Sequence, residues 1–260
     1  MPSKPAAMHS DWLRPDWELP HVRAFMTTRA GGVSDGAYAS MNVGRSVHDA
    51  PERVAANRAL VSQALQARAV FMPQVHGAAV LRLRPEHAEA GVEVPAADAS
   101  ISTVPGLACA IQVADCLPVL FAAPAGVGGA HAGWRGLAAG VLEHTVQALC
   151  EASGCAPRDL HAWLGACIGP QAFEVGADVL AAFGADPARP DPRYFVYRPN
   201  QAGEPRWRAD LVALARTRLQ TAGVAHISGG GWCTFGEASR FFSYRRTRLS
   251  GRMVAAISLR

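Results

Sequence analysis

The sequence predicts a mixed α/β fold of the α+β kind, in which mixed β-sheets are flanked by helices. Short runs rich in Val, Ile and Leu, bounded by Gly and Pro, are typical of buried strands. Between them lie longer segments whose apolar residues recur at helical spacing. Half of the 260 residues are hydrophobic, which is enough for a sizeable core. Because no linker divides the chain, we expect one domain over residues 1–260, with residues 1–20 as an irregular lead-in.

The expected strands follow the β-branched and aliphatic runs of the chain. In order, they cover residues 22–27, 80–83, 99–102, 107–123, a short run up to His131, 161–164, a segment after residue 222, and 253–259. Residues 124–129 supply Pro, Gly and Ala, so we expect a hairpin that turns near Ala125. This hairpin joins the long apolar run to the run that ends at His131.

Four segments have the apolar spacing or the composition of helices. They cover residues 51–68, 136–151, 177–183 and 209–222. Pro51 stands near the start of the first helix, where proline is tolerated. Residues 184–205 are rich in Pro and Gly, and we expect them to form an exposed loop or a lid over the functional site.

Composition argues against several classes of protein. The net charge of +4 comes from 25 basic and 21 acidic residues, a balance too even for a nucleic-acid-binding protein. The most apolar stretch, residues 107–125, is interrupted by Gln112, Asp115 and two prolines, so we expect no membrane span. The six cysteines form no Cys-x-x-Cys pair, and residues 1–11 lack the apolar core of a signal peptide. We therefore expect a cytoplasmic protein with reduced thiols.

Three residues stand out as candidate metal ligands. His76 lies in Gln-Val-His-Gly, Cys116 in Ala-Asp-Cys-Leu-Pro, and His131 in Ala-His-Ala-Gly-Trp-Arg-Gly. Two imidazoles and one thiolate match the number of protein ligands in a catalytic zinc site, whose fourth position stays open. The expected hairpin places Cys116 opposite His131, with Cβ atoms about 4.5–5.5 Å apart. His76, at the start of a strand, has to reach them through the tertiary fold.

Ten ordered strings between residue 27 and the C-terminus resemble the YfiH family, also called the laccase-domain, polyphenol oxidase or peptidoglycan-editing-factor family. The strings are Thr27-Thr28-Arg29, Gly31-Gly32-Val33-Ser34, Met41-Asn42-Val43-Gly44, Asn57-Arg58, Gln74-Val75-His76-Gly77, Ala97-Asp98-Ala99, Ala114-Asp115-Cys116-Leu117-Pro118-Val119, His131-Ala132-Gly133-Trp134-Arg135-Gly136, Ile168-Gly169-Pro170 and Phe241-Phe242-Ser243-Tyr244-Arg245-Arg246. The resemblance covers nearly the whole chain and implies a YfiH-like fold.

The resemblance also implies an activity. It implies that His76, Cys116 and His131 bind zinc, and that the protein is a purine nucleoside phosphorylase with adenosine deaminase activity. The substrates would be adenosine, inosine or methylthioadenosine with phosphate, converted to the free base and ribose 1-phosphate. The chain departs from the family at a loop where the usual His is replaced by Ser46, while a His appears at position 48.

Five further residues are candidates for the same site because they adjoin its motifs. Asp115 is expected to orient a ligand or to transfer protons, since an acid inside an apolar run needs a partner. Arg45 and Arg135 are expected to hold phosphate through forked hydrogen bonds. Asn42 and Gln74 are expected to bind polar edges of the substrate. The helix expected at residue 136 would also present its N-terminus to an anion.

Two other enzymatic functions and one non-enzymatic function remain open. Cys116 as a thiolate nucleophile with His131 as its base would make a hydrolase, such as an amidase that edits a peptidoglycan precursor of the UDP-MurNAc-L-Ser type. A copper polyphenol oxidase is disfavoured, since a multicopper centre needs many histidines and the nine present form no His-x-His pair. A non-enzymatic binding module would expose an apolar patch or partner helix, and the sequence suggests neither.

Overall fold

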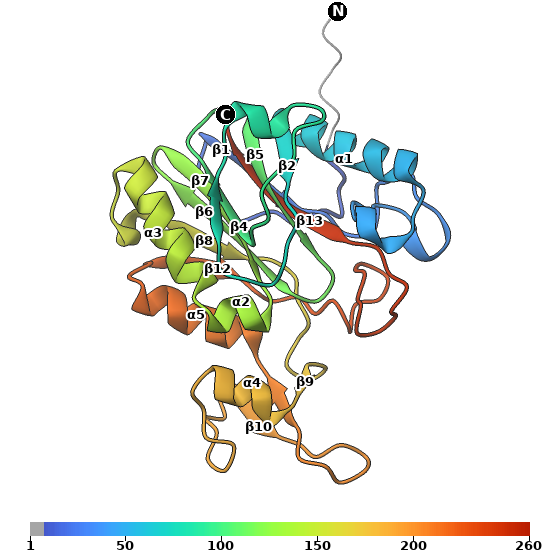
Figure 1. Ribbon diagram of the computed structural model, residues 1–260, viewed down its shortest axis with the longest axis vertical. Coiled ribbons are helices and arrows are strands. Elements are labelled where there is room, and N and C mark those ends of the chain that lie inside the picture. The colour runs from blue at the N-terminus through green and yellow to red at the C-terminus, as the bar shows by residue number, and fades with distance from the viewer. Residues whose placement is uncertain (1–7) are drawn as a thin grey trace, which may run out of the picture.

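Two mixed β-sheets pack face to face, and helices cover the outer face of each sheet (Figure 1). The computed structural model describes residues 8–260. The strand order of the first sheet is β1 (Val22–Met26), β13 (Met253–Leu259), β5 (Leu107–Val113) and β2 (Arg68–Phe71). The order of the second is β12 (His226–Gly229), β8 (His161–Leu164), β6 (Leu117–Ala123), β7 (Gly126–Ala132), β4 (Ala99–Ser102) and β3 (Val80–Arg82). The mixed α/β fold predicted from the sequence is therefore confirmed.

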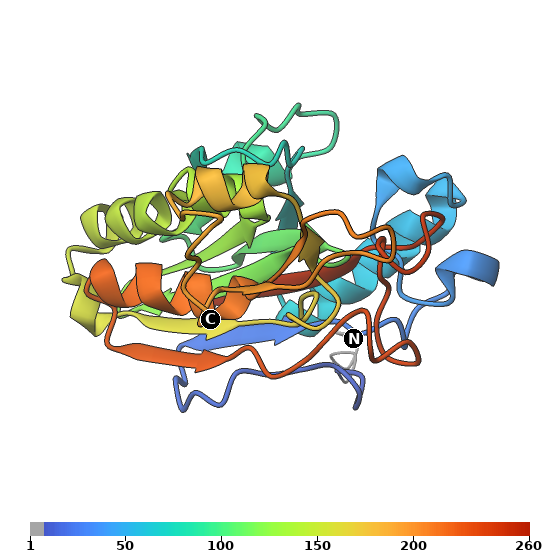
Figure 2. The ribbon, with the colours of Figure 1, turned by 90° about the horizontal axis from the view of Figure 1, so that it is seen from below.

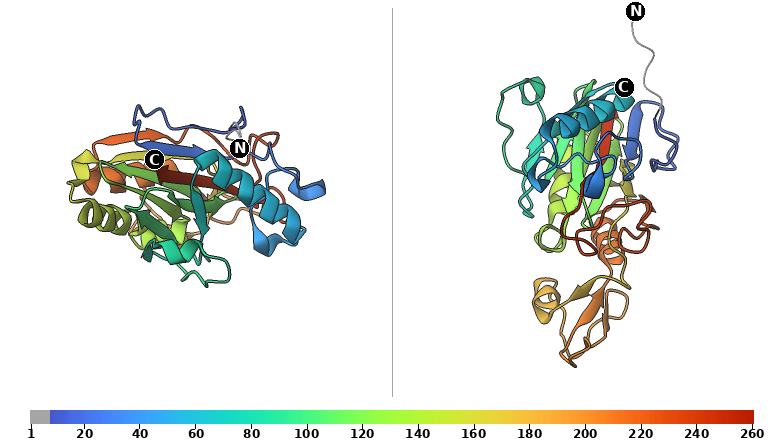
Figure 3. Two further views of the ribbon diagram at one scale, coloured as in Figure 1. Left: turned by 90° about the horizontal axis from the view of Figure 1, so that it is seen from above. Right: turned by 90° about the vertical axis from the view of Figure 1, so that its right-hand side faces the viewer.

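The helices lie on both sides of the paired sheets. They are α1 (Pro51–Leu65), α2 (Trp134–Ala138), α3 (Val141–Ser153), α4 (Ala177–Ala182) and α5 (Leu211–Thr221). In the view from below and the view from above, α1 and α3 lie at opposite ends of the molecule (Figures 2 and 3). No helix of the described residues is long and apolar enough to cross a membrane.

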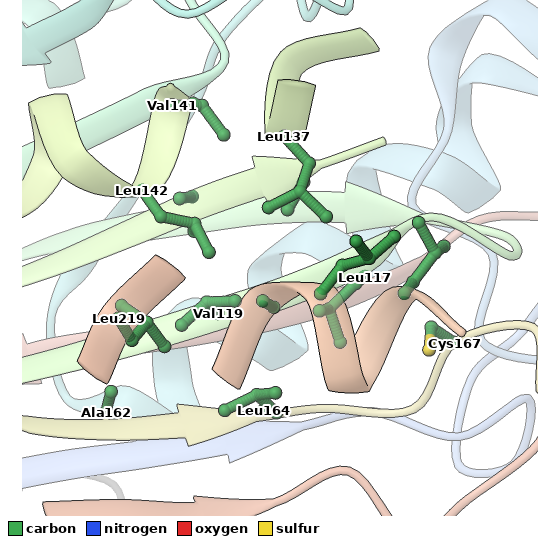
Figure 4. Close-up of a cluster of buried hydrophobic side chains, with 14 of the residues drawn as sticks. Leu117, Val119, Leu137, Val141, Leu142, Ala162, Leu164, Cys167 and Leu219 are labelled. Atoms are coloured by element: carbon green, nitrogen blue, oxygen red, sulfur yellow. The ribbon is translucent and has the colours of Figure 1, made fainter. Parts of the chain in front are cut away.

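The core between the second sheet and its helices explains the uninterrupted apolar runs. On β6, Val119 and Phe121 pack toward α3 and α5, while Leu120 packs toward the first sheet. Because helices cover one face and a sheet covers the other, every residue of β6 is buried, and no polar residue alternates with the apolar ones. Figure 4 shows the helix side of this core, where labelled side chains converge from Leu117, Val119, Leu137, Val141, Leu142, Ala162, Leu164, Cys167 and Leu219.

On the far side of the molecule, α1 packs against the first sheet. The outward positions of β5 and β13 are small, including Ala108, Ala110 and Ala256. Small side chains let the helix approach closely, and Val61 and Leu65 of α1 fill the space above them.

A smaller lobe projects from one end of the molecule (Figure 1). It contains α4 and a three-stranded sheet in the order β10 (Phe195–Tyr197), β11 (Trp207–Ala209) and β9 (Glu174–Val175). Residues 184–205 were expected to be a loop or a lid, yet they include β10. None of them lines the large cavity described below.

The structure corrects the long strand expected over residues 107–123. The chain forms two strands, β5 and β6, that belong to different sheets. Between them, Asp115 adopts a φ of 103°, and its buried carboxylate accepts hydrogen bonds from the Thr234 hydroxyl and the Arg245 backbone N–H. These long-range contacts stabilise a turn that hydrophobicity alone does not reveal.

Two expected helices also have different bounds. The first ends at Leu65 because Gln66 is left-handed, and residues 68–71 form the unpredicted strand β2. The helix expected over 136–151 is two helices, α2 and α3, because Gly140 between them has a φ of 88°. A left-handed residue ends a helix locally, whatever the apolar pattern on either side.

We predict that Asp115→Asn destabilises the fold by about 2 kcal/mol. The carboxylate now accepts from the Thr234 hydroxyl and the Arg245 N–H, and in the variant an NH₂ group would face one of these two donors. Asn tolerates a positive φ, so the change tests the hydrogen bonds and not the backbone. Urea unfolding followed by circular dichroism measures the effect, with exposed Asp11→Asn as the control. Equal midpoints for both variants would contradict it.

Candidate metal centre and active site

His76, Cys116 and His131 come together in the structure. One ligand atom from each lies within 4.8 Å of the other two. The Cys116 Sγ is 3.9 Å from His76 Nε2, and the two imidazole rings meet edge to face with centroids 4.8 Å apart. The proximity expected from the three motifs is therefore present.

Each ligand is placed by a different local structure. The hairpin brings Cys116 and His131 near each other as expected, although the register is shifted: His131 of β7 lies opposite Pro118 of β6, two residues after Cys116. His76 belongs to the segment between β2 and β3 and has a left-handed φ of 61°. A strained backbone at a non-glycine residue needs support from its surroundings.

Asp98 provides that support, and it was not singled out from the sequence. Its fully buried carboxylate accepts backbone hydrogen bonds from Val75, His76 and Gly77, at 3.1, 2.9 and 2.7 Å. The same carboxylate lies 2.8 Å from His131 Nδ1. This network assigns the proton of neutral His131 to Nδ1 and leaves Nε2 as the ligand atom. The sequence signals were an acid at the start of a buried strand and its place in the family string Ala97-Asp98-Ala99.

The electrostatics of the trio favour a thiolate. Burial raises the pKa of Cys116, but attraction to His131 and hydrogen bonds from both imidazoles outweigh it and lower this pKa to about 6. Burial lowers the pKa of His131, but Cys116 and Asp98 outweigh it and raise this pKa to about 9. Burial also raises the pKa of Asp98, and its hydrogen bonds reverse that effect, so the net pKa is lowered.

These residues fit a metal ion. Two imidazoles and a thiolate suit zinc in type and number, and Asp98 supplies the carboxylate that commonly orients a ligating histidine. A His-Cys-His group in this arrangement can hold a metal with one position open to a substrate.

Glycines allow the surrounding segments to close on the trio. A Cβ on Gly133 would lie 3.0 Å from His76 Cδ2 and 3.1 Å from Cys116 Sγ. A Cβ on Gly136 would lie 2.5 Å from the carbonyl oxygen of Gly77, which is closer than real contacts allow. The string after His131 therefore needs glycine for close approach, not for a positive φ.

The trio opens into a cavity of about 900 Å³. Its volume is within the range of small-molecule sites. Its lining residues are Gly44, Arg45, Ser46, Val47, His48, Arg58, Phe71, Met72, Pro73, Gln74, His76, Gln112, Val113, Ala114, Cys116, His131, Tyr244, Arg248, Leu249 and Arg252. Ser46 and His48, where the chain departs from the family pattern, are both among them.

Two of the expected substrate-binding residues line this cavity. Arg45 does so from the loop before α1, and Gln74 does so from the segment before His76. The Gln74 amide is already engaged, because it donates to the backbone oxygen of Gln112 and accepts from its N–H, both at 2.8 Å. Its polar atoms therefore brace the wall of the cavity.

The other three candidates lie outside the lining. Asn42 is fully buried and bonds to the loop around it. Arg135 is exposed and stacks on the Trp134 ring at 4.3 Å. The carboxylate of Asp115 is held by Thr234 and Arg245, as described above. The prediction from their position next to a motif in the sequence therefore did not hold for the cavity lining: these three side chains are not part of it.

Comparison with known proteins agrees with the motifs. The model of the family described as multi-copper polyphenol oxidoreductase laccase matches residues 23–260. A purine nucleoside phosphorylase of Pseudomonas aeruginosa is 45% identical over 95% of this chain and 98% of its own length. The purine nucleoside phosphorylase YfiH of Escherichia coli is also 45% identical, over 96% of this chain and 99% of its own.

The chain belongs to the YfiH (laccase-domain) family. Its fold is similar to that of a Neisseria meningitidis protein of this family, with a TM-score of 0.82, 40% identity, and coverage of 96% of this chain and 99% of that one. YlmD from Geobacillus stearothermophilus has a TM-score of 0.84 at 34% identity, with 96% of each chain covered.

We predict that Gly133→Ala lowers metal occupancy while the fold survives. The backbone at Gly133 has a φ of −63°, which alanine adopts freely, so crowding of His76 and Cys116 is the only new strain. Metal content after equal dialysis measures the effect. Gly231→Ala is the control, because a Cβ there meets nothing within 4 Å. Equal metal content in the two variants would refute the steric argument.

We also predict that Asp98→Asn weakens metal binding by about 10- to 100-fold. The amide removes a negative charge and opposes one of the four N–H groups that point at this carboxylate. Competition with a coloured chelator measures the affinity. The Asp98→Glu variant, which keeps the charge but not the geometry, shows which of the two matters; wild-type affinity in both would contradict the prediction.

Proposed function

We propose that this protein is a zinc-dependent purine nucleoside phosphorylase that converts adenosine, inosine or methylthioadenosine and phosphate to the free base and ribose 1-phosphate. One observation carries the proposal: the His-Cys-His group opens into a cavity lined by four arginines and by no aspartate or glutamate. Such a cavity suits a reaction that pairs an inorganic anion with a neutral nucleoside. Relatives named purine nucleoside phosphorylases support it.

In phosphorolysis, an oxygen of phosphate forms a bond to ribose C1′ as the bond from C1′ to the purine nitrogen breaks. The electron pair leaves with the base, which takes up a proton. Zinc held by His76, Cys116 and His131 would supply a Lewis acid that stabilises negative charge on an oxygen ligand. The arginines would hold the phosphate, while Gln74 and Gln112 bond to each other in the cavity wall. Phe71 and Tyr244 offer aromatic surface to a purine.

Adenosine deamination belongs to the same proposal. Here water adds to purine C6 and ammonia leaves, so the reaction needs the metal ligands but no phosphate. This difference distinguishes the metal ligands from the phosphate-binding residues, since loss of a phosphate-binding residue should impair phosphorolysis more than deamination.

A Cys-His hydrolase that edits a peptidoglycan precursor is the second candidate. The lowered pKa of Cys116, about 6, and its 3.9 Å separation from His76 favour it. Two neighbouring histidines suit a metal better than a single general base does, and for that reason it ranks second. A copper polyphenol oxidase ranks third, because the described residues offer one cluster of three potential ligands.

One experiment separates these candidates. Protein purified without added metal is analysed for metal content and then incubated with adenosine and phosphate. About one zinc per chain with formation of adenine and ribose phosphate supports the proposal. A metal-free protein whose activity is lost on thiol alkylation favours the hydrolase, and copper with oxygen consumption favours the oxidase.

We predict that His76→Ala loses the metal and at least about 100-fold in kcat/KM for phosphorolysis, because two ligands hold zinc far more weakly than three. Metal analysis and product formation are measured on one sample. His87→Ala, in a turn outside the cavity, is the control. Full activity in a metal-free His76→Ala protein would rule out the zinc mechanism.

A further inference from the structure

Positive charge from arginines is the main electrostatic feature of the cavity. Arg45, Arg58, Arg248 and Arg252 line it, and the lining contains no carboxylate. Within residues 8–260, none of the four guanidinium groups has a carboxylate oxygen within the 4.0 Å of a salt bridge. Arg58 and Arg252 are also substantially buried, which sets them apart from arginines on a solvated surface.

Arg58 is held rigidly at the cavity wall. Its Nε donates to the backbone oxygen of Val43 at 2.8 Å, and its Nη2 donates to Gln112 Oε1 at 3.1 Å. Its guanidinium lies 4.0 Å above the centroid of the Phe71 ring. Burial, followed by repulsion from Arg45, lowers the pKa of Arg58 to about 9, so the group remains charged at neutral pH.

Arg252 is also held in place, by contacts with residues 42 and 44. Its backbone N–H donates to Asn42 Oδ1 at 2.8 Å, and its Nη1 donates to the backbone oxygens of Ser250 and Gly251. Its stem packs on Gly44, where a Cβ would lie 2.7 Å from Arg252 Cγ. Burial is the largest influence on its pKa, which is lowered.

The Asn42-Val43-Gly44-Arg45 segment therefore organises three arginines. Arg45 belongs to the segment, Arg58 bonds to Val43, and Arg252 packs on Gly44 and bonds to Asn42. The buried Asn42 side chain also accepts the Gly44 N–H and donates to Asp49, which fixes the loop. Asn42 is thus a positioning residue for the arginines, although the sequence suggested that it contacts the substrate.

Such an arrangement has a physical consequence. Buried guanidinium groups that lack carboxylates are destabilising unless hydrogen bonds and an anion compensate. The backbone and glutamine oxygens that Arg58 and Arg252 contact are neutral acceptors, so they orient the groups without cancelling the charge. Each guanidinium keeps free N–H groups for a forked contact with an oxyanion.

We propose that Arg58 and Arg252, assisted by Arg45, form a phosphate subsite that is built on the loop of residues 42–45 and lies in the same cavity as the His-Cys-His group. The proposal depends on the proposed phosphorolysis for the identity of its natural ligand. The group that the subsite binds is a tetrahedral phosphate oxyanion. It can arrive as free inorganic phosphate, the co-substrate, or as the phosphoryl group of a nucleotide.

The test measures binding directly. Zinc-loaded protein in a buffer free of phosphate and sulfate is titrated calorimetrically with inorganic phosphate, and separately with adenosine 5′-monophosphate. The variants are Arg58→Gln and Arg252→Gln, with Arg58→Lys in case the first does not fold. We expect each glutamine variant to weaken phosphate binding by about 10- to 100-fold, the range for loss of charged hydrogen bonds. Arg58→Lys should lie between them and the wild type.

Controls keep the outcome specific to the subsite. Arg158→Gln removes an equal charge from a side chain that is 81% exposed and outside the cavity, and it should leave binding unchanged. Equal zinc content across the series excludes an effect through the metal. In steady-state assays, the KM for phosphate should rise by the same factor while the KM for the nucleoside changes less than threefold.

The outcomes separate this proposal from the proposed function. Weaker phosphate binding in the arginine variants supports the subsite. If the wild type also cleaves no nucleoside, the subsite stands and only the proposed phosphorolysis is refuted. Weakened binding of the nucleotide alone supports the subsite with a substrate-borne phosphoryl group as its ligand. Active variants with unchanged binding of both ligands and unchanged phosphate KM would overturn the subsite and leave the proposed function standing.

Discussion

The metal-ligand geometry depends on the buried carboxylate of Asp98. It accepts three consecutive backbone N–H groups of the segment that carries His76, and it bonds to the ring of His131. A carboxylate with this many donors is a strong, charge-assisted network in a low-dielectric interior. Because β4 begins one residue later and pairs with β7, the same residue ties an irregular loop to the sheet that bears His131. Two of the three ligands are therefore positioned by one side chain.

The third ligand depends on how the chain crosses between sheets. β5 belongs to the first sheet and β6 to the second, and Cys116 lies at the crossing. Asp115 stabilises the crossing through Thr234 and Arg245, so the thiol is aimed by residues more than a hundred positions away. Gly133 and Gly136 then leave room for the neighbouring segments to approach. The candidate metal ligands are thus positioned by the same contacts that pack the two sheets.

The cavity divides into two regions of different chemistry. In the region of the His-Cys-His group, a thiolate and a carboxylate offset the charge of histidines or a metal. In the region of the arginines, neutral oxygens hold the guanidinium groups, so their positive charge is not cancelled. The proposed phosphorolysis would use both regions: the arginines would place the anion, and the His-Cys-His group would stabilise charge that moves during bond exchange. The aromatic rings of Phe71 and Tyr244 lie beside the arginines and complete the wall.

Local patterns in the sequence determined much of this protein. The strands at 99–102, 161–164 and 253–259 were predicted with the observed bounds, because each is a short segment with β-branched, aromatic or aliphatic residues that are buried in the sheet. Cys116 and His131 were correctly expected to lie near each other because a hairpin is a short-range structure, although His131 pairs with Pro118. Only the tertiary structure decided the positions and contacts of Asp98, Asp115, Arg58 and Arg252. Each acts through partners distant in sequence, and no local spacing encodes such contacts. The sequence therefore determined which chemical groups are present, and the fold determined which of them face the cavity.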